Sequence, residues 1–139
     1  MERARRIAAL MAQPPDVAMR PAGRCWAFAA AAEQALFGRV LPAVAVSQEL
    51  DVGWVKHAFA CHPEHQRWAL RPPARHGLAD AMDGSLVLMS GAGRPHHVGV
   101  WLKAERAVLH ADHQAVKLED VVTLKARGFT RLRFYEPKA

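Results

Sequence analysis

The sequence predicts an α+β fold, with helices in its first part and a mostly antiparallel sheet in its second. Two observations support this prediction. Up to about residue 61, apolar residues recur at helical spacing or cover whole helical turns. From residue 85 on, they form short runs rich in valine and leucine, and short turns separate most of these runs, as in an antiparallel meander. The length of 139 residues fits a single domain, residues 1–139.

Three helices are expected before the sheet. Residues 3–13 form an amphipathic stretch that ends at two consecutive prolines, which cannot continue a helix. Residues 25–38 are apolar nearly all round, as in a buried central helix, and end at a glycine, the residue type favoured just past a helix C-terminus. Residues 47–61 have apolar side chains at helical spacing, and the proline-containing segment 62–80 is expected to be a loop.

Five strands are expected after residue 80. Each is a short run in which valine, leucine or aromatic residues are frequent. The first four follow one another through short turns, as in a meander. The expected strands are 85–90, 97–102, 107–111, 115–118 and 130–136, and a helix is expected at 119–127 before the last strand.

The chain is basic, and its charge fits several anionic partners. Lysine and arginine total 19 against 13 aspartates and glutamates, which gives a net charge of +6. Such a protein favours nucleic acid, acidic lipid or the anionic bacterial cell wall at low salt, and charge does not choose among them. Arg3, Arg5 and Arg6 form a basic helical face, which is more typical of a solvated surface than of a nucleic-acid site. We therefore expect no specific nucleic-acid partner.

No segment resembles a membrane span or a secretion signal. No run approaches the ~20 apolar residues that cross a bilayer, so no membrane span is expected. The charged start of the chain is followed by an apolar run, residues 7–12, that is shorter than the apolar core of a signal peptide. We expect a protein that is made in the cytoplasm and leaves it, if at all, without a Sec signal.

The segment AGRCWAFAAAAEQALFG, residues 22–38, holds a candidate nucleophile, Cys25. The expected helix starts there, and a helix N-terminus favours a thiolate through its free N–H groups and the positive end of its dipole. A free cysteine is also commonly a small buried apolar residue, and position alone favours that interpretation. A disulfide between Cys25 and Cys61 could form, but nothing in the sequence requires it.

Two histidines on neighbouring strands could supply a base and a group that orients it. His97 opens the run HVGVWL, His110 lies in AVLHA, and a turn at 104–106 would join the two strands as a hairpin. Counting back from that turn places the two rings on adjacent strands. Gly99 would let another backbone or a helix approach closely. With Cys25, the set contains a nucleophile, a base and an orienting residue, which are the components of nucleophilic catalysis.

Papain itself does not fit this arrangement. The motif around Cys25 is close to the papain signature, but that family places its histidine and asparagine about 130–150 residues after the cysteine. His97 follows Cys25 much sooner, and the chain contains no asparagine. A Cys-His-Asn triad therefore cannot be built.

The whole arrangement resembles the NlpC-type cell-wall peptidases, which are smaller relatives of papain. The segment RCWAFAAAAEQALFGRVLP resembles the family's cysteine-headed helix, and tryptophan often follows the cysteine in the phage-tail branch. The segment DGSLVLMSGAGRPHHVGVWL resembles the family's strand, loop and H-V-G strand, and AVLHADHQAVKLED resembles the next hairpin. The resemblance covers most of the chain. It implies one papain-like NlpC-type domain, with N-terminal helices packed on a small sheet.

The resemblance also implies roles for residues and a function. Cys25 would be the nucleophile, His97 the general base and His110 the residue that orients His97. His96 would be a neighbour on the opposite strand face, and His113 a turn residue. The implied protein is a cysteine hydrolase that cleaves an amide bond in peptidoglycan stem peptides. It would be associated with a phage or prophage tail and act in the periplasm or cell wall.

Two other functions stay open. A catalytically silent tail or assembly protein could use the same fold. The family usually has aspartate where this chain has Arg24, and a tyrosine ahead of the cysteine, whereas the only tyrosine here is Tyr135. A thiol-dependent amidase or acyltransferase acting on a non-wall substrate would use the same three candidate residues.

No cofactor or metal site is expected. Cys61, His62 and His65 lie together in CHPEH, but four ligands at zinc spacing are not visible and the proline between them prevents a helical pair. The sequence contains no phosphate loop and no dinucleotide fingerprint.

Overall fold

The computed structural model describes most of the chain, in six segments. They are residues 2–12, 21–41, 68–70, 80–91, 94–112 and 115–137. The expected helix at 47–61, which includes Cys61, lies outside these segments. Among the described helices, none is both long and apolar enough to cross a membrane.

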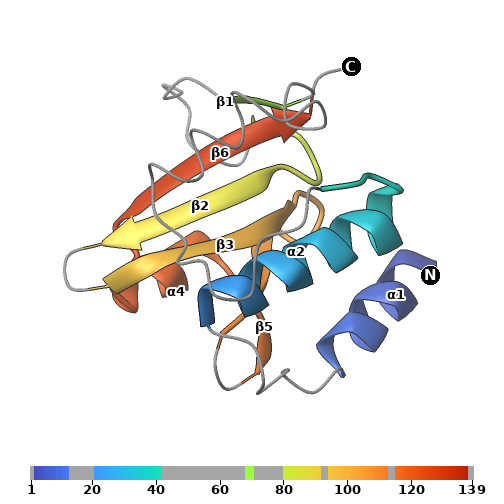
Figure 1. Ribbon diagram of the computed structural model, residues 1–139, viewed down its shortest axis with the longest axis horizontal. Helices are drawn as coiled ribbons and strands as arrows, with labels where there is room; N and C mark the ends of the chain where they lie inside the picture. The colour runs from blue at the N-terminus through green and yellow to red at the C-terminus, as the bar shows by residue number, and fades with distance from the viewer. Residues whose placement is uncertain are drawn as a thin grey trace.

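The predicted α+β architecture is confirmed, with one antiparallel sheet at its centre (Figure 1). The strands are β1 Trp68–Leu70, β2 Leu86–Gly91, β3 Arg94–Leu102, β4 Ala107–Ala111, β5 Val116–Glu119 and β6 Arg131–Pro137. Their order across the sheet is β1-β6-β2-β3-β4-β5, and each neighbouring pair is antiparallel. The predicted meander is therefore β2 to β5, and β6 returns to pair with β2.

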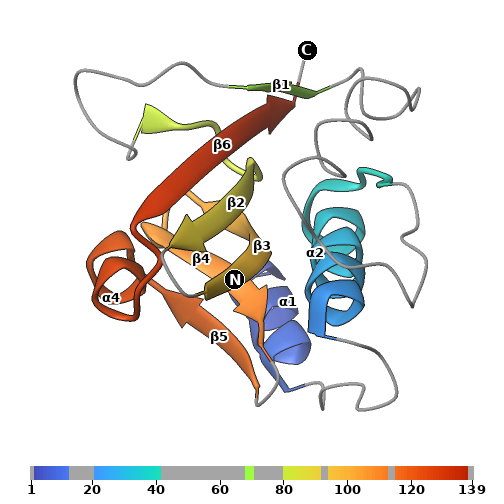
Figure 2. The same cartoon turned by 60° about the vertical axis from the view of Figure 1, so that its left-hand side comes forward.

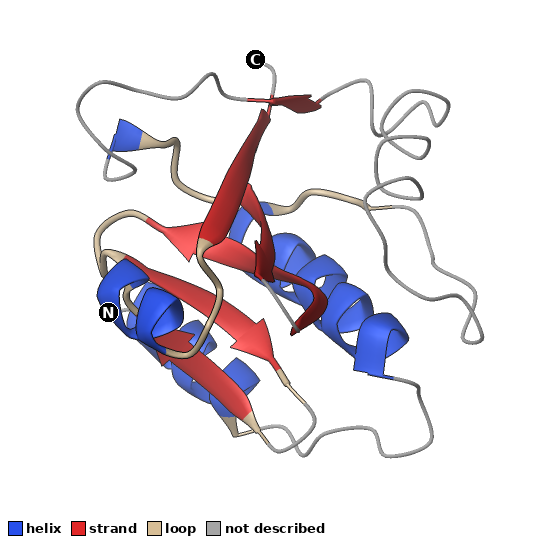
Figure 3. Cartoon of the chain, turned by 90° about the vertical axis from the view of Figure 1, so that its left-hand side faces the viewer, coloured by secondary structure: helices blue, strands red, loops and turns tan. Residues whose placement is uncertain are grey.

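Helices lie on both sides of the sheet (Figures 2 and 3). They are α1 Glu2–Met11, α2 Pro21–Phe37 and α4 Val121–Ala126. In Figure 2 the strands separate α4 from α2, and α1 packs beside α2. The helix predicted at 119–127 is present as α4, and it begins two residues later than predicted, at Val121, because the Asp120 side chain accepts a hydrogen bond from the Thr123 N–H, as an N-cap residue does.

The helix α2 begins earlier than predicted. It starts at Pro21 rather than near Cys25. Proline is favoured at a first helical position, because its fixed φ suits the helix and its missing N–H would have no helical partner there. Cys25 therefore follows the first turn of α2 instead of opening the helix. The predicted end is confirmed, since Gly38 has a φ of 67°, the left-handed conformation favoured past a helix C-terminus.

Two strand predictions also need correction. The expected loop at 62–80 contains β1, which pairs with β6. Three residues are too few to show the alternation by which a strand is recognised in a sequence. In addition, β3 extends back to Arg94, because its first residues pair with the end of β2 at Gly91.

The sheet separates two apolar clusters. Alternate residues of a strand point to opposite faces, and successive residues of β2 accordingly enter different clusters. The cluster on the α2 side includes Cys25, Trp26, Phe28, Leu86, Leu88, Val98, Val100, Leu109 and Tyr135. The cluster on the α4 side includes Val87, Met89, Trp101, Val108, Leu124, Phe129 and Phe134.

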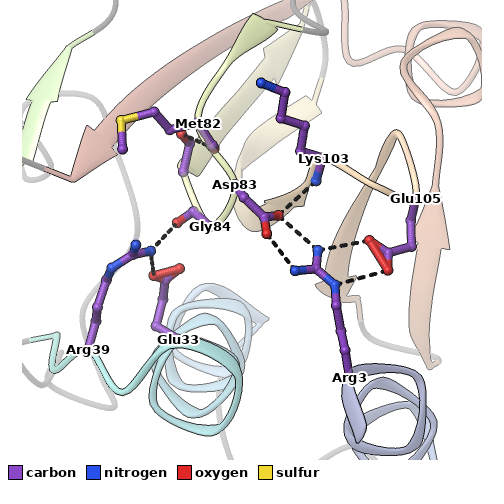
Figure 4. A network of polar contacts seen from close by, with 9 residues as sticks. Arg3, Glu33, Arg39, Met82, Asp83, Gly84, Lys103 and Glu105 are labelled. Carbon is purple, nitrogen blue, oxygen red and sulfur yellow. Dashed lines mark hydrogen bonds and ion pairs between the residues drawn. The ribbon is translucent and has the colours of Figure 1, made fainter. Parts of the chain in front are cut away.

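An ionic network fixes α1 against the sheet (Figure 4). Arg3 donates to Asp83, which precedes β2, and to Glu105 in the turn between β3 and β4, with an N–O distance of 2.8 Å to Glu105. The Asp83 carboxylate also accepts the Lys103 backbone N–H at 2.9 Å. One arginine of the first helix thus joins two loops of the sheet.

Candidate functional site

The structure brings His97 and His110 into direct hydrogen-bond contact. His97 Nε2 lies 2.8 Å from His110 Nδ1, and the two rings meet edge to face. The β3–β4 hairpin positions them, and its turn closes with a hydrogen bond from the Arg106 N–H to the Lys103 carbonyl. The adjacency inferred by counting back from the turn is therefore confirmed. The contact leaves the other ring nitrogen of His97, Nδ1, for a different partner.

Gly99 makes room for this pair. A Cβ atom at Gly99 would lie 2.5 Å from Val108 Cγ1 and 3.0 Å from the Cβ of His110. Close approach at Gly99 was predicted, and the structure shows that β4 approaches it with the Val108 and His110 side chains and with the backbone oxygen of Leu109, which would lie 3.0 Å from the added Cβ. A larger residue at this position would push His110 away from β3.

Both histidines are neutral at neutral pH. Burial, followed by the charge of His110, lowers the pKa of His97 to about 3. Burial, followed by the charge of Arg127, lowers the pKa of His110 to about 4. The carboxylate of Asp112 opposes both shifts in pKa but does not outweigh burial. On the other side of His97, Phe129 stacks on the ring with the centroids 5.7 Å apart.

The Cys25 thiol is buried in α2, with no exposed surface. Burial raises the pKa of the Cys25 thiol to about 11, and hydrogen bonds from the backbone of Val98, of Trp26 and of Cys25 itself oppose that rise. The Val98 contact places the sulfur at β3, beside the peptide bond that joins Val98 to His97.

The Cys25 sulfur contacts β3 at the point where the pairing of β3 with β4 ends. Their paired residues run from Leu102 and Ala107 to Val100 and Leu109. The Trp101 N–H points to the opposite side of β3, where it donates to Ser85. Backbone N–H groups alternate along a strand, so the Val98 N–H points to the β4 side, just past the last of these pairs.

The contact between the Cys25 sulfur and β3 lies between residues that face opposite sides of the sheet. Val98 belongs to the apolar cluster on the α2 side, whereas His97 stacks on Phe129 of the α4-side cluster. A sulfur that reaches the edge of β3 between these faces is next to the residue that carries the candidate base. The direct contact between Cys25 Sγ and His97 Nδ1 stays a prediction.

Two functional candidates were missed in the sequence. Glu119 accepts a hydrogen bond from His110, with 2.8 Å between His110 Nε2 and Glu119 Oε1, and Arg127 donates to the same oxygen. The register of β4 and β5 places Glu119 near His110. Lys117 stands opposite His110, and Glu119 lies two residues after Lys117, so Glu119 is on the same face of the sheet as His110. His113 and the side chain of His96 lie outside what the structure describes.

His110, rather than Asp112, is the residue bonded to His97 Nε2. The Asp112 carboxylate receives Lys117 Nζ at 2.7 Å, Arg127 at 3.3 Å and the Ala115 N–H at 2.9 Å. Its charge also acts on both histidines, where it opposes the lowering of their pKa values. Within the described segments, no group of three or more His, Cys, Asp or Glu residues is arranged to hold a metal ion. The segment CHPEH lies outside them.

The sequence was compared with family models and with curated proteins. No family model matches the chain, and no curated protein matches it significantly.

Proposed function

We propose that the protein is a cysteine hydrolase of the NlpC type that cleaves an amide bond in peptidoglycan stem peptides. One observation carries the proposal: His97 is bonded through Nε2 to His110, and the Cys25 sulfur meets the backbone amide next to His97. Thiol catalysis requires a base side chain within hydrogen-bond reach of the thiol, and a base held by one ring nitrogen, with the thiol beside its strand, supports such an arrangement.

The finer fold assignment belongs to the same proposal. The α2 helix carries the cysteine, and it packs against the strand that carries H-V-G, with the second histidine on the next strand. This order of elements supports a papain-like NlpC-type domain. A phage or prophage tail would deliver such a protein to the wall, and a net charge of +6 favours the anionic wall polymer.

In the proposed mechanism, Cys25 and His97 are both neutral at the start, rather than a thiolate and an imidazolium. Nδ1 of His97 takes the proton from Cys25 Sγ as the sulfur attacks the amide carbonyl. The resulting imidazolium gives that proton to the leaving amine, and the C–N bond breaks. Water then attacks the thioester with His97 as base, which releases the acid and restores the thiol. His110 holds the His97 ring throughout by the Nε2 contact.

Purified sacculi test this proposal. The wild-type protein should release peptides whose masses identify one cleaved amide bond, and Cys25→Ala and His97→Ala should release none. Cys61→Ser is the matched control, because it removes the other thiol of the chain and should keep the activity. Activity that persists in Cys25→Ala, or that disappears in Cys61→Ser, would show that the nucleophile is wrongly assigned.

A specific observation also favours a second candidate, a tail or assembly protein in which the chemistry has been lost. The Cys25 thiol has no exposed surface, and burial raises its pKa to about 11, whereas catalytic thiols usually have a lowered pKa. This candidate predicts intact sacculi and the same result for wild type and Cys25→Ala. A thiol-dependent amidase or acyltransferase on another substrate would also leave sacculi intact, but Cys25 would form an acyl adduct with its own substrate.

A further inference from the structure

The His97–His110 contact is part of a longer chain of hydrogen bonds that ends on a carboxylate. His110 uses both ring nitrogens, Nδ1 toward His97 and Nε2 toward Glu119, and each contact measures 2.8 Å. His110 has no exposed surface, so neither nitrogen can exchange its partner for water without a structural change. The proton pattern of the two rings is therefore determined inside the protein.

The donors and acceptors can be assigned from the carboxylate end. Oε1 of Glu119 receives a hydrogen bond from Arg127, and a guanidinium group is a donor only. An oxygen that receives Arg127 and also contacts His110 Nε2 acts as an acceptor in both contacts. Nε2 of His110 therefore carries a hydrogen.

The assignment then passes from one ring to the next. Neutral His110 with a hydrogen on Nε2 has none on Nδ1, so Nδ1 accepts a hydrogen bond from His97 Nε2. Neutral His97 with a hydrogen on Nε2 has a bare Nδ1. That is the nitrogen that must be bare if His97 is to take the proton of Cys25.

We infer that Glu119 is a positioning residue that sets this proton pattern and so keeps His97 Nδ1 available as a base. The role of Nδ1 as the base rests on the proposed function, whereas the proton pattern itself does not. Without Glu119, His110 can carry its hydrogen on Nδ1 and donate to His97 Nε2. His97 would then carry its own hydrogen on Nδ1 and could not accept another while neutral.

The residues around Glu119 hold it in place, which supports a specific contact with His110 rather than a chance one. Glu119 precedes the N-cap residue of α4, and Arg127 is the C-cap residue of the same helix. This short helix thus brings a carboxylate and its guanidinium partner together from its two ends. Arg127 also contacts Asp112, which is held by Lys117. Asp112 therefore holds the arginine that contacts Glu119, and Lys117 holds Asp112 in turn.

Nitrogen NMR of the wild-type protein tests the pattern directly. Long-range proton–nitrogen correlation spectra of ¹⁵N-labelled protein distinguish a protonated ring nitrogen from a bare one. At neutral pH, His97 and His110 should both carry their hydrogen on Nε2 and none on Nδ1. A hydrogen on Nδ1 of either ring would overturn the inference, whatever the protein does to sacculi.

Variants of Glu119 test the cause. Glu119→Ala should shift hydrogen to Nδ1 of both rings and lower kcat on sacculi about 10- to 100-fold, with little change in KM, as loss of an orienting partner does. Glu119→Gln keeps an oxygen that accepts from His110 and should retain the wild-type tautomers and most of the rate. If Glu119→Ala folds and keeps the wild-type tautomers, the inference is wrong.

Glu105→Ala is the matched control. It also removes a partly buried glutamate paired with an arginine, Arg3, but it lies in the turn at the far end of the β3–β4 pairing. It should leave the histidine spectra and kcat unchanged. Failure of the two proposals can be told apart: wild-type protein with the expected tautomers but no action on sacculi would refute the proposed function and leave the role of Glu119 intact.

Discussion

At the scale of single residues, the site depends on which atom each ring nitrogen contacts. His110 Nδ1 is positioned to accept from His97. An oxygen at that position can replace the nitrogen, whereas a methyl group cannot. We therefore expect His110→Gln or His110→Asn to lose less activity on sacculi than His110→Ala, and all three to lose less than His97→Ala. Equal and small losses in all three His110 variants would show that His110 is an ordinary strand residue.

Substitution of Asp112 tests the same assignment, because Asp112 is the alternative candidate for the residue that orients His97. The Asp112 carboxylate contacts Lys117 and Arg127, and its charge opposes the lowering of the pKa of both histidines. The residue bonded to His97 Nε2, however, is His110. Asp112→Ala should therefore reduce activity less than His110→Ala. Kinetics that show a severe loss only in Asp112→Ala would assign the orienting role to Asp112.

Gly99 gives a prediction that combines stability with site geometry. In Gly99→Ala, the new Cβ would lie 2.5 Å from Val108 Cγ1 and 3.0 Å from His110 Cβ, so the strands must shift. We expect a loss of about 1–3 kcal/mol in the free energy of unfolding, measured in urea, and altered ring resonances of His97 and His110.

Gly38→Ala is the control for Gly99→Ala, because it makes the same glycine-to-alanine change away from the histidines. Gly38 has positive φ, and a Cβ added there would have no neighbouring atom within 4 Å, so alanine costs backbone strain without crowding the site. It should lower stability and leave the histidine resonances unchanged. Unchanged resonances in Gly99→Ala as well would contradict the role given to Gly99.

At the scale of the elements, α2 carries a second unusual group, well along the helix from Cys25. Glu33 has no exposed surface, and among the residues that the structure describes neither carboxylate oxygen has a hydrogen-bond donor within range. Arg39 lies 3.7 Å from Oε2, close enough for an ion pair but too far for a hydrogen bond (Figure 4). Burial therefore raises the pKa of Glu33 to about 8, with the charge of Arg39 in opposition.

This shift predicts how α2 responds to pH. The folded protein keeps a proton on Glu33 up to a pKa of about 8, whereas the unfolded chain loses it above an ordinary pKa of 4.5. Between these values the folded state binds more protons, so wild-type stability falls as pH rises, by at most about 1.4 kcal/mol per pH unit from this group. Glu33→Gln cannot ionise and should gain stability relative to wild type across that range. A difference between the two proteins that does not vary with pH would refute the prediction.

The elements also show what a sequence can predict here. The run AVLHA was predicted as a strand and is β4 with the same bounds, because valine and leucine on a short run between turns fit only a strand. The His97–His110 contact followed from the hairpin, since the turn fixes which residues of β3 and β4 are neighbours. Local signals were sufficient in both cases.

Glu119 and the Val98–Cys25 contact could not be predicted in the same way. Which residue of β5 stands near His110 depends on strand register, and a slip of one residue would turn Glu119 to the other face. The sulfur contact depends on where β3 and β4 part and on how α2 packs, which are tertiary properties. The start of α2 was misplaced because a proline suits a loop as well as a first helical position, and Pro21 occupies the latter.

At the scale of the whole molecule, the buried His110 and the half-buried His97 make the free energy of unfolding fall in acid. Their ordinary pKa is 6.5, and the folded protein lowers the pKa of His97 to about 3 and that of His110 to about 4. Between these values the unfolded chain binds more protons, so the free energy of unfolding falls as pH falls from about 7 toward 4. Each histidine contributes a slope of at most about 1.4 kcal/mol per pH unit.

Urea unfolding of wild type and His110→Gln across this range isolates one of the two groups. Titrating residues that do not interact with His110 are common to both proteins and cancel in the difference. The variant should lose stability with a shallower slope as pH falls. Identical slopes would contradict a buried neutral His110.

The central claim is that Cys25 and His97 work as a nucleophile and its base, and the rate of Cys25 alkylation tests it most directly. Iodoacetamide labelling, located by peptide mass mapping, should modify Cys25 in the wild-type protein about 10-fold faster at neutral pH than in His97→Ala, because His97 takes the thiol proton. The wild-type rate should keep rising into the alkaline range, since burial raises the pKa of Cys25 to about 11. Equal rates of Cys25 labelling in wild type and His97→Ala would contradict the account.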